Sequence, residues 1–137
     1  MITVEEKLHL GLEAHQAGLF PEAEAHYQSI LDSHPYHAAT NHAMGLLRRA
    51  QNKPAKAVPF LRTALQDMSD VEHLWFDCLD ALIEAECWRE SLNLVQSARS
   101  AGLAEGELDN REMQILPHII EQNFSVLDCQ VSPGASD

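Results

Sequence analysis

The stretch from Gly11 to Pro35, GLEAHQAGLFPEAEAHYQSILDSHP, decides the fold because parts of it recur further along the chain at one fixed interval. The interval is 34 residues, and it links Gly11 with Gly45, Ala23 with Ala57, and Tyr27 with Leu61 and Val95. A chain with such a period is built from stacked units, because a single unit cannot bury its apolar face alone. The period therefore predicts a repeat protein, an architecture typical of binding scaffolds.

The composition predicts that these units are helical. The chain has 137 residues, of which 45% are hydrophobic and only 6% aromatic, and Ala, Leu and Glu are abundant. This usage suits helices better than sheets, which are enriched in Val, Ile, Thr and Tyr. A single, nearly all-α domain is expected.

Capping signals divide each unit into two helices joined by a short turn. Thr3 followed by Glu6 can cap a first helix that stops at Gly18, and Pro21 suits the first turn of a second helix. Ser69 followed by Glu72 is the same capping pattern, and it predicts where the third unit begins. We therefore expect three helical hairpins.

Asp109 and Glu112 can cap a seventh helix, whose single apolar face would cover the last hairpin. The last residues have turn and tail composition. The predicted organisation is a domain over residues 1–123, with repeats at about 4–37, 38–71 and 72–105, a capping helix at about 109–123, and a tail at 124–137.

The repeated residues resemble those of the tetratricopeptide repeat (TPR) family. With repeats starting at Val4, Ala38 and Glu72, the resemblance covers about residues 4–105. The matching positions are Leu10, Gly11, Ala14, Ala23, Tyr27 and Pro35, then Met44, Gly45, Ala57, Leu61 and Ala64, then Trp75, Leu82, Val95 and Ala98. The resemblance implies an all-α fold, a right-handed α-α superhelix of three TPR hairpins with a seventh capping helix.

The resemblance also implies a concave groove lined by the first helix of each hairpin. Positions 2, 5, 9 and 12 of a repeat usually face this groove, which carries over to Glu5 and Ala39 and to ten candidate ligand-binding residues. These ten are Leu8, Leu12, His15, His42, Leu46, Arg49, His73, Phe76, Asp80 and Ile83. Half of them are apolar, so the predicted partner is an apolar or amphipathic polypeptide segment.

Several other occupants and roles stay open. The chain's own segment Phe124-Ser125-Val126-Leu127, or a second copy in a homodimer, could cover the groove instead of a foreign partner. A dedicated chaperone for an aggregation-prone helix, or the repeat module of a larger transferase, are the alternatives to an adaptor. Family members that clamp acidic chaperone tails use Lys, Asn and Arg where this chain has Leu8, Leu12, Ala43, His73 and Asp77, so that ligand class is excluded.

Charge excludes a further class of partner. The formal net charge is −12 and the isoelectric point is near 4.9, a field that repels nucleic acid and anionic lipid headgroups. Three cysteines without close pairing, and a start that lacks the apolar run of a secretory signal, favour a cytoplasmic protein. Neither nucleic acid nor a membrane is expected as a partner.

No catalytic motif is found, so the chain is not expected to be an enzyme or to carry a cofactor. Eight histidines raise the question of a metal, chiefly at His34, His37 and His42. A metal site needs three or four converging ligands, and no nearby Cys or acid has a spacing that would complete one. The sequence therefore predicts no metal site.

Overall fold

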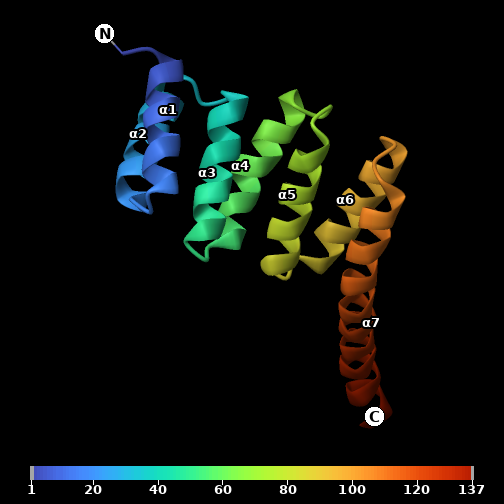
Figure 1. Cartoon of the computed structure of the whole chain (residues 1–137). Helices are drawn as coiled ribbons and strands as arrows, with labels where there is room; N and C mark the ends of the chain where they lie inside the picture. The colour runs from blue at the N-terminus through green and yellow to red at the C-terminus, as the bar shows by residue number, and fades with distance from the viewer. Residues whose placement is uncertain (1, 137) are drawn as a thin grey trace. The chain divides into compact units, whose positions relative to one another are not determined.

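The computed structural model describes the backbone of residues 2–136 and the side chains of residues 2–123, and its described part contains seven helices and no strand (Figure 1). The all-α prediction is confirmed, whereas the proposed covering role of segment 124–127 lies outside the described side chains. No described helix has the length and apolar character of a membrane span. The helices are α1 (Val4–Gln16), α2 (Phe20–Ser33), α3 (Ala38–Ala50), α4 (Pro54–Asp67), α5 (Glu72–Glu84), α6 (Trp88–Ser100) and α7 (Glu105–Ser136).

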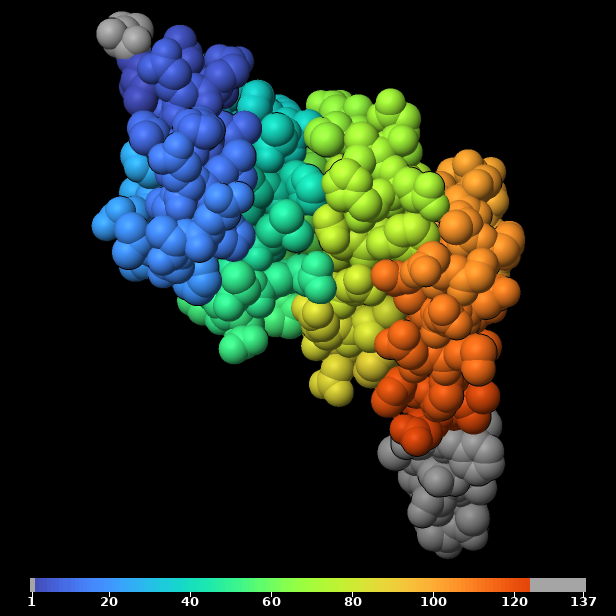
Figure 2. Space-filling model, in the orientation of Figure 1, coloured from blue at the N-terminus to red at the C-terminus, as the bar shows by residue number. Residues whose placement is uncertain are grey.

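The chain divides into two compact units, Met1–Ala85 with α1 to α5 and Glu86–Asp137 with α6 and α7. In the first unit each even-numbered helix packs on the helix before it and the helix after it. Helix α3 also contacts α1 and α5, so the first helices of the three predicted repeats are neighbours (Figure 1). The space-filling view shows the side chains of this unit closely packed (Figure 2).

The turn that follows each first helix repeats in conformation as well as in position. Gly18, Asn52 and Glu86 lie 34 residues apart, and their φ angles are +78°, +60° and +60°. After α1 the turn closes with a hydrogen bond of 2.8 Å from Leu19 N to Ala14 O, and after α3 with the equivalent bond from Lys53. The 34-residue period is therefore visible in the backbone even where glycine is absent.

Close contact within each of the first two hairpins depends on a glycine opposite a large side chain. A Cβ atom added to Gly11 would lie 2.5 Å from Cε1 of Tyr27, and one added to Gly45 would lie 2.5 Å from Cδ2 of Leu61. Tyr27 and Leu61 are fully buried. The glycines thus let the two helices of a hairpin approach until the ring or the leucine fills the space beside them.

Both predicted helix starts are confirmed, α1 at Val4 and α5 at Glu72, but only one of the two predicted side-chain caps is present. Thr3 Oγ1 accepts a hydrogen bond of 3.1 Å from Glu6 N at the start of α1, as expected. Helix α5 is instead preceded by Val71, which makes no side-chain cap. The carbonyl of Ser69 accepts a bond of 2.8 Å from the indole N–H of Trp75, because this largely buried ring needs an acceptor.

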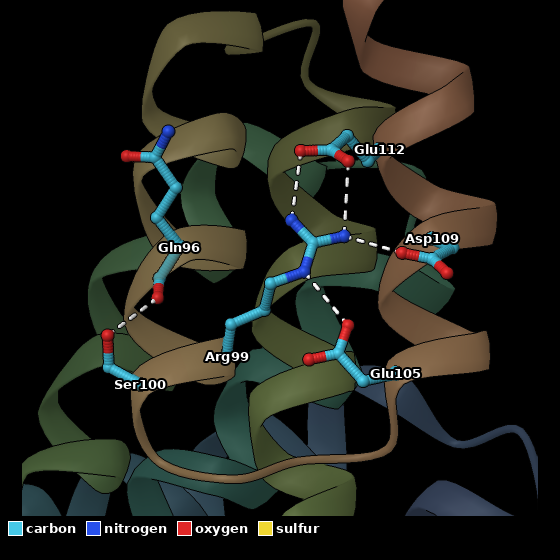
Figure 3. A network of polar contacts seen from close by, with 6 residues as sticks. All are labelled: Gln96, Arg99, Ser100, Glu105, Asp109 and Glu112. Carbon is cyan, nitrogen blue, oxygen red and sulfur yellow. Dashed lines mark hydrogen bonds and ion pairs between the residues drawn. The ribbon is translucent and has the colours of Figure 1, made fainter.

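In the second unit, α7 begins at Glu105 and not near Asp109, because one arginine collects the acids of its first two turns (Figure 3). The guanidinium of Arg99 donates to Glu112 at 3.0 and 3.1 Å, to Glu105 at 3.0 Å and to Asp109 at 2.6 Å. These bonds, with that to Glu112 the strongest, raise the pKa of Arg99 above its ordinary value. Asp109 therefore lies inside the helix and helps to join α7 to α6.

Apolar contact completes this join. Helix α7 packs on α6, and its side chains Leu108 and Ile115 are fully buried. The rings of Trp88 and His118 stack with centroids 3.8 Å apart and planes 4° from parallel. A helix at the end of the chain that covers its predecessor agrees with the predicted capping function.

Candidate functional site

The ten residues predicted for the groove all lie on α1, α3 and α5 of the first unit, on the three helices that neighbour one another. None of them is buried: Leu12 is 40% exposed, His73 is exposed, and the others are half-buried. We call this surface the first-helix face, and it comprises Leu8, Leu12 and His15 on α1, His42, Leu46 and Arg49 on α3, and His73, Phe76, Asp80 and Ile83 on α5. Their ligand-binding role stays a prediction.

The part of the first-helix face on α1 is mainly apolar. Leu8 packs partly against the core formed by the first two hairpins, whereas Leu12 projects into solvent. The rings of His15 and Phe20 lie edge to face, with centroids 5.6 Å apart and an interplanar angle of 85°. The imidazole of His15 therefore packs against an aromatic ring beside this surface.

The part between α3 and α5 is polar and already internally paired. His42 Nε2 lies 2.8 Å from Asp77 Oδ2, and the ring of His42 lies 5.6 Å from that of His73. Arg49 donates to both carboxylate oxygens of Glu84, at 3.1 and 2.8 Å, and its Nη1 is 3.8 Å from Asp77 Oδ1. The two helices are therefore linked by charged groups along the same face.

The ten candidate residues did not include Asp77 and Glu84, each of which pairs with one of the ten. Both pairs, His42 with Asp77 and Arg49 with Glu84, are separated by 35 residues, one more than the repeat. A search for opposite charges at one period plus one residue would have found both pairs. Each pair therefore joins a residue of one first helix to the residue that follows its repeat equivalent on the next first helix.

Arg49 is engaged and cannot serve as a simple anchor for a carboxylate. Its hydrogen bond to Glu84 raises the pKa of the guanidinium, against desolvation, and the charges of Asp80 and Asp77 act in the same direction. Three carboxylates therefore surround one guanidinium. The local field on this part of the first-helix face favours a cation.

Cys78 lies on α5 but does not contribute reactive chemistry to this face. It is fully buried, and burial raises the pKa of its thiol to about 11, although the neighbouring Arg62 acts in the opposite direction. A thiol with that pKa stays protonated at neutral pH, and the thiolate is the nucleophilic form. Cys78 is accordingly a core residue.

The two histidines closest in sequence to His42 interact with their own surroundings. Nδ1 of His34 lies 2.9 Å from Ser33 Oγ, and Nδ1 of His37 lies 2.7 Å from Thr40 Oγ1. The structure therefore does not bring His42 together with His34 and His37, the histidines that raised the question of a metal site in the sequence. It groups His42 with residues of the next repeat.

Comparison with known proteins bears on the fold. No protein-family model matches the sequence, and no curated protein matches it. In structure the chain is similar to the crystal structure of the P58(IPK) TPR domain, with a TM-score of 0.70 and 19% sequence identity. The match covers 97% of this chain and 37% of that one, so the chain spans little more than a third of its structural neighbour. The TPR-like fold implied by the resemblance of the repeated residues is thereby confirmed.

Proposed function

We propose that this TPR-like chain is an interaction module whose first-helix face binds an amphipathic polypeptide segment that carries basic residues, and that it converts no substrate itself. The observation that supports the proposal most strongly is the combination, within the first-helix face and its neighbours, of solvent-exposed Leu12 on α1 with the three α5 carboxylates around Arg49. An apolar strip takes up the apolar side of a helix or extended segment. The acids add attraction for its basic side.

The charged residues around Arg49 indicate that the partner segment is basic. Arg49 is paired with Glu84, so an acidic peptide would have to displace this carboxylate to gain a contact. A basic peptide meets three carboxylates, Asp77, Asp80 and Glu84, around a single guanidinium, so the excess of negative charge favours it. The net charge of −12 also speeds the approach of a basic segment.

A second apolar surface competes with this assignment. Leu10 and Leu19 are 39% and 46% exposed, and they line a shallow pocket with Ala17, Glu22 and His26 at the outer side of the first hairpin. Residues 10 and 12 point in nearly opposite directions from α1, so the two surfaces are distinct. Leu10 and Leu19 therefore offer a matched control for Leu12 and Leu46.

The test uses peptides selected from a random displayed library against the full chain. Selected peptides are expected to alternate apolar with Lys or Arg residues at helical spacing, and to bind more weakly as salt is raised. Leu12→Asn with Leu46→Asn is expected to weaken their binding about a hundredfold, since each buried leucine side chain contributes about tenfold or more. Fluorescence anisotropy measures the dissociation constant.

The control is Leu10→Asn with Leu19→Asn, which makes the same chemical change at two exposed leucines outside the first-helix face and should leave affinity within about twofold. Circular dichroism establishes that both double variants are folded. Equal losses in the two variants, or selection of acidic peptides, would contradict the proposal. A single tightly held partner that is insoluble alone would favour a dedicated chaperone over a reversible adaptor.

A further inference from the structure

A cluster of metal-ligating side chains lies within the first-helix face. His42 on α3 and His73 and Asp77 on α5 each present one ligand atom, and these atoms all lie within 4.8 Å of one another. His42 and Asp77 are half-buried, and His73 is exposed. We infer that these three side chains form a binding site for Zn²⁺ or a similar divalent transition metal, a property that goes beyond the proposed peptide binding.

The residue types and their spacing suit such an ion. His73 and Asp77 are four residues apart on α5 and so project from the same side of the helix, one turn apart. His42 supplies the third ligand from the adjacent helix. Two imidazole nitrogens and one carboxylate oxygen are ligands that zinc accepts, and a three-residue set leaves a fourth position for water.

The three ligand atoms need only small shifts to reach the spacing of a zinc site. Zinc bonds of about 2.0–2.2 Å hold tetrahedral ligand atoms about 3.4 Å apart. His42 Nε2 and Asp77 Oδ2 are 2.8 Å apart, so they would separate by about 0.6 Å, and a metal ion would replace the hydrogen bond between them. His73 is exposed and can turn about its side-chain torsions to bring its nitrogen closer.

Neighbouring charges position the carboxylate and compensate the ion. Arg49 Nη1 is 3.8 Å from Asp77 Oδ1, so the arginine faces one oxygen while the other oxygen faces His42. Arg49 is in turn held by Glu84. Groups that orient a ligand in this manner are typical of the outer shell of metal sites. Asp77, Asp80 and Glu84 together outweigh the single guanidinium, so a divalent cation meets a negative field.

The ion would join two successive repeats. Its ligands come from α3 and α5, which contact each other in the first unit. Binding to the folded chain alone stabilises it by mass action. Metal at about a hundred times its dissociation constant is expected to raise the melting temperature by about 5–10 °C.

The test is a titration of the full chain, freed of metal with a chelator and without any peptide, with Zn²⁺ by calorimetry and with Co²⁺ by absorption. One equivalent is expected to bind, and the cobalt spectrum should show d–d bands without a thiolate charge-transfer band. His73→Gln and His42→Gln should each weaken binding at least tenfold. The thermal shift with Zn²⁺ should disappear in both variants.

The matched control is His34→Gln with His37→Gln, which removes two histidines outside the cluster and should leave the affinity and the thermal shift unchanged. Circular dichroism without metal checks the fold of each variant. Because His73 is exposed, its replacement is less disruptive to folding than that of half-buried His42. Absence of stoichiometric binding, loss of binding in the control, retention of it in His73→Gln, or a thiolate band would each overturn the inference. Since no peptide is present, these results are independent of the proposed function.

Discussion

Gly45→Leu is expected to destabilise the chain by about 3 kcal/mol or more. A Cβ at this position would lie 2.5 Å from Leu61 Cδ2 and 2.6 Å from Leu61 Cγ, and Ala57 O is 3.4 Å away. Leu61 and Ala57 are fully buried, so neither can move aside without opening the hairpin. Overpacking of a well-filled core costs about 1–3 kcal/mol for extra methylenes, and a whole leucine exceeds that range. Denaturant unfolding followed by circular dichroism measures the loss.

Gly106→Leu is the matched control, because nothing lies within 4 Å of a Cβ added to Gly106 and its backbone is helical. This variant is expected to stay within about 1 kcal/mol of the parent. Combining Gly45→Ala with Leu61→Val should recover part of the loss seen in Gly45→Ala alone, since the smaller partner makes room. Equal stability of Gly45→Leu and Gly106→Leu would show that the hairpin does not depend on this close approach.

Tyr27→Phe is expected to stabilise the chain by about 1 kcal/mol at neutral pH. Tyr27 is fully buried against Gly11, and among the described residues its hydroxyl has no hydrogen-bond partner. A buried hydroxyl without a partner costs about 1–3 kcal/mol, and phenylalanine keeps the ring that fills the space. The aromatic ring of Tyr27 therefore stabilises the hairpin by filling the space beside Gly11, and its hydroxyl does not contribute.

The difference should grow in alkali. Burial raises the pKa of Tyr27 to about 12, from an ordinary value of 10.0. Above the ordinary value the unfolded chain releases the proton while the folded chain keeps it, so the stability of the parent falls as pH rises from about 10 to about 12. The advantage of Tyr27→Phe should increase by about 1 kcal/mol at about pH 11.

The matched control for this prediction is Tyr36→Phe, since Tyr36 is 74% exposed. It should change stability by less than about 0.5 kcal/mol. Unfolding in denaturant at neutral and alkaline pH measures both variants. The buried thiol of Cys78, whose pKa is raised to about 11, also titrates in alkali, and comparing the two variants cancels its contribution because both retain it. A destabilised Tyr27→Phe would mean that the hydroxyl makes a contact that this account lacks.

The sequence predicted the hairpins well because their determinants are local and repeated. Gly11 with Tyr27 and Gly45 with Leu61 are residues that any hairpin of this type needs, so their spacing carries the fold. The predictions failed where a side chain contacts a residue six positions away near a helix start. Ser69 gives its carbonyl to Trp75 and caps no helix, and Arg99 draws the start of α7 to Glu105.

The helices that carry the candidate residues were predictable, but the contacts between their side chains were not. Repeat positions assigned residues such as His42 and Arg49 to a groove, and their ligand-binding role stays a prediction. Repeat positions did not identify Asp77 and Glu84 as partners, because such pairs depend on the offset and side-chain direction between neighbouring helices. For the same reason, spacing along the chain could not show that His42 meets His73 and Asp77.

Photo-crosslinking tests most directly whether the first-helix face binds the partner segment. A selected peptide that carries a diazirine group is irradiated with the full chain, and mass spectrometry then locates the attached residues. The account predicts attachment on α1, α3 and α5, around Leu12, Leu46 and Phe76, and its loss when unlabelled peptide competes. Attachment on α2 and α4, or around Leu10 and Leu19, would contradict it.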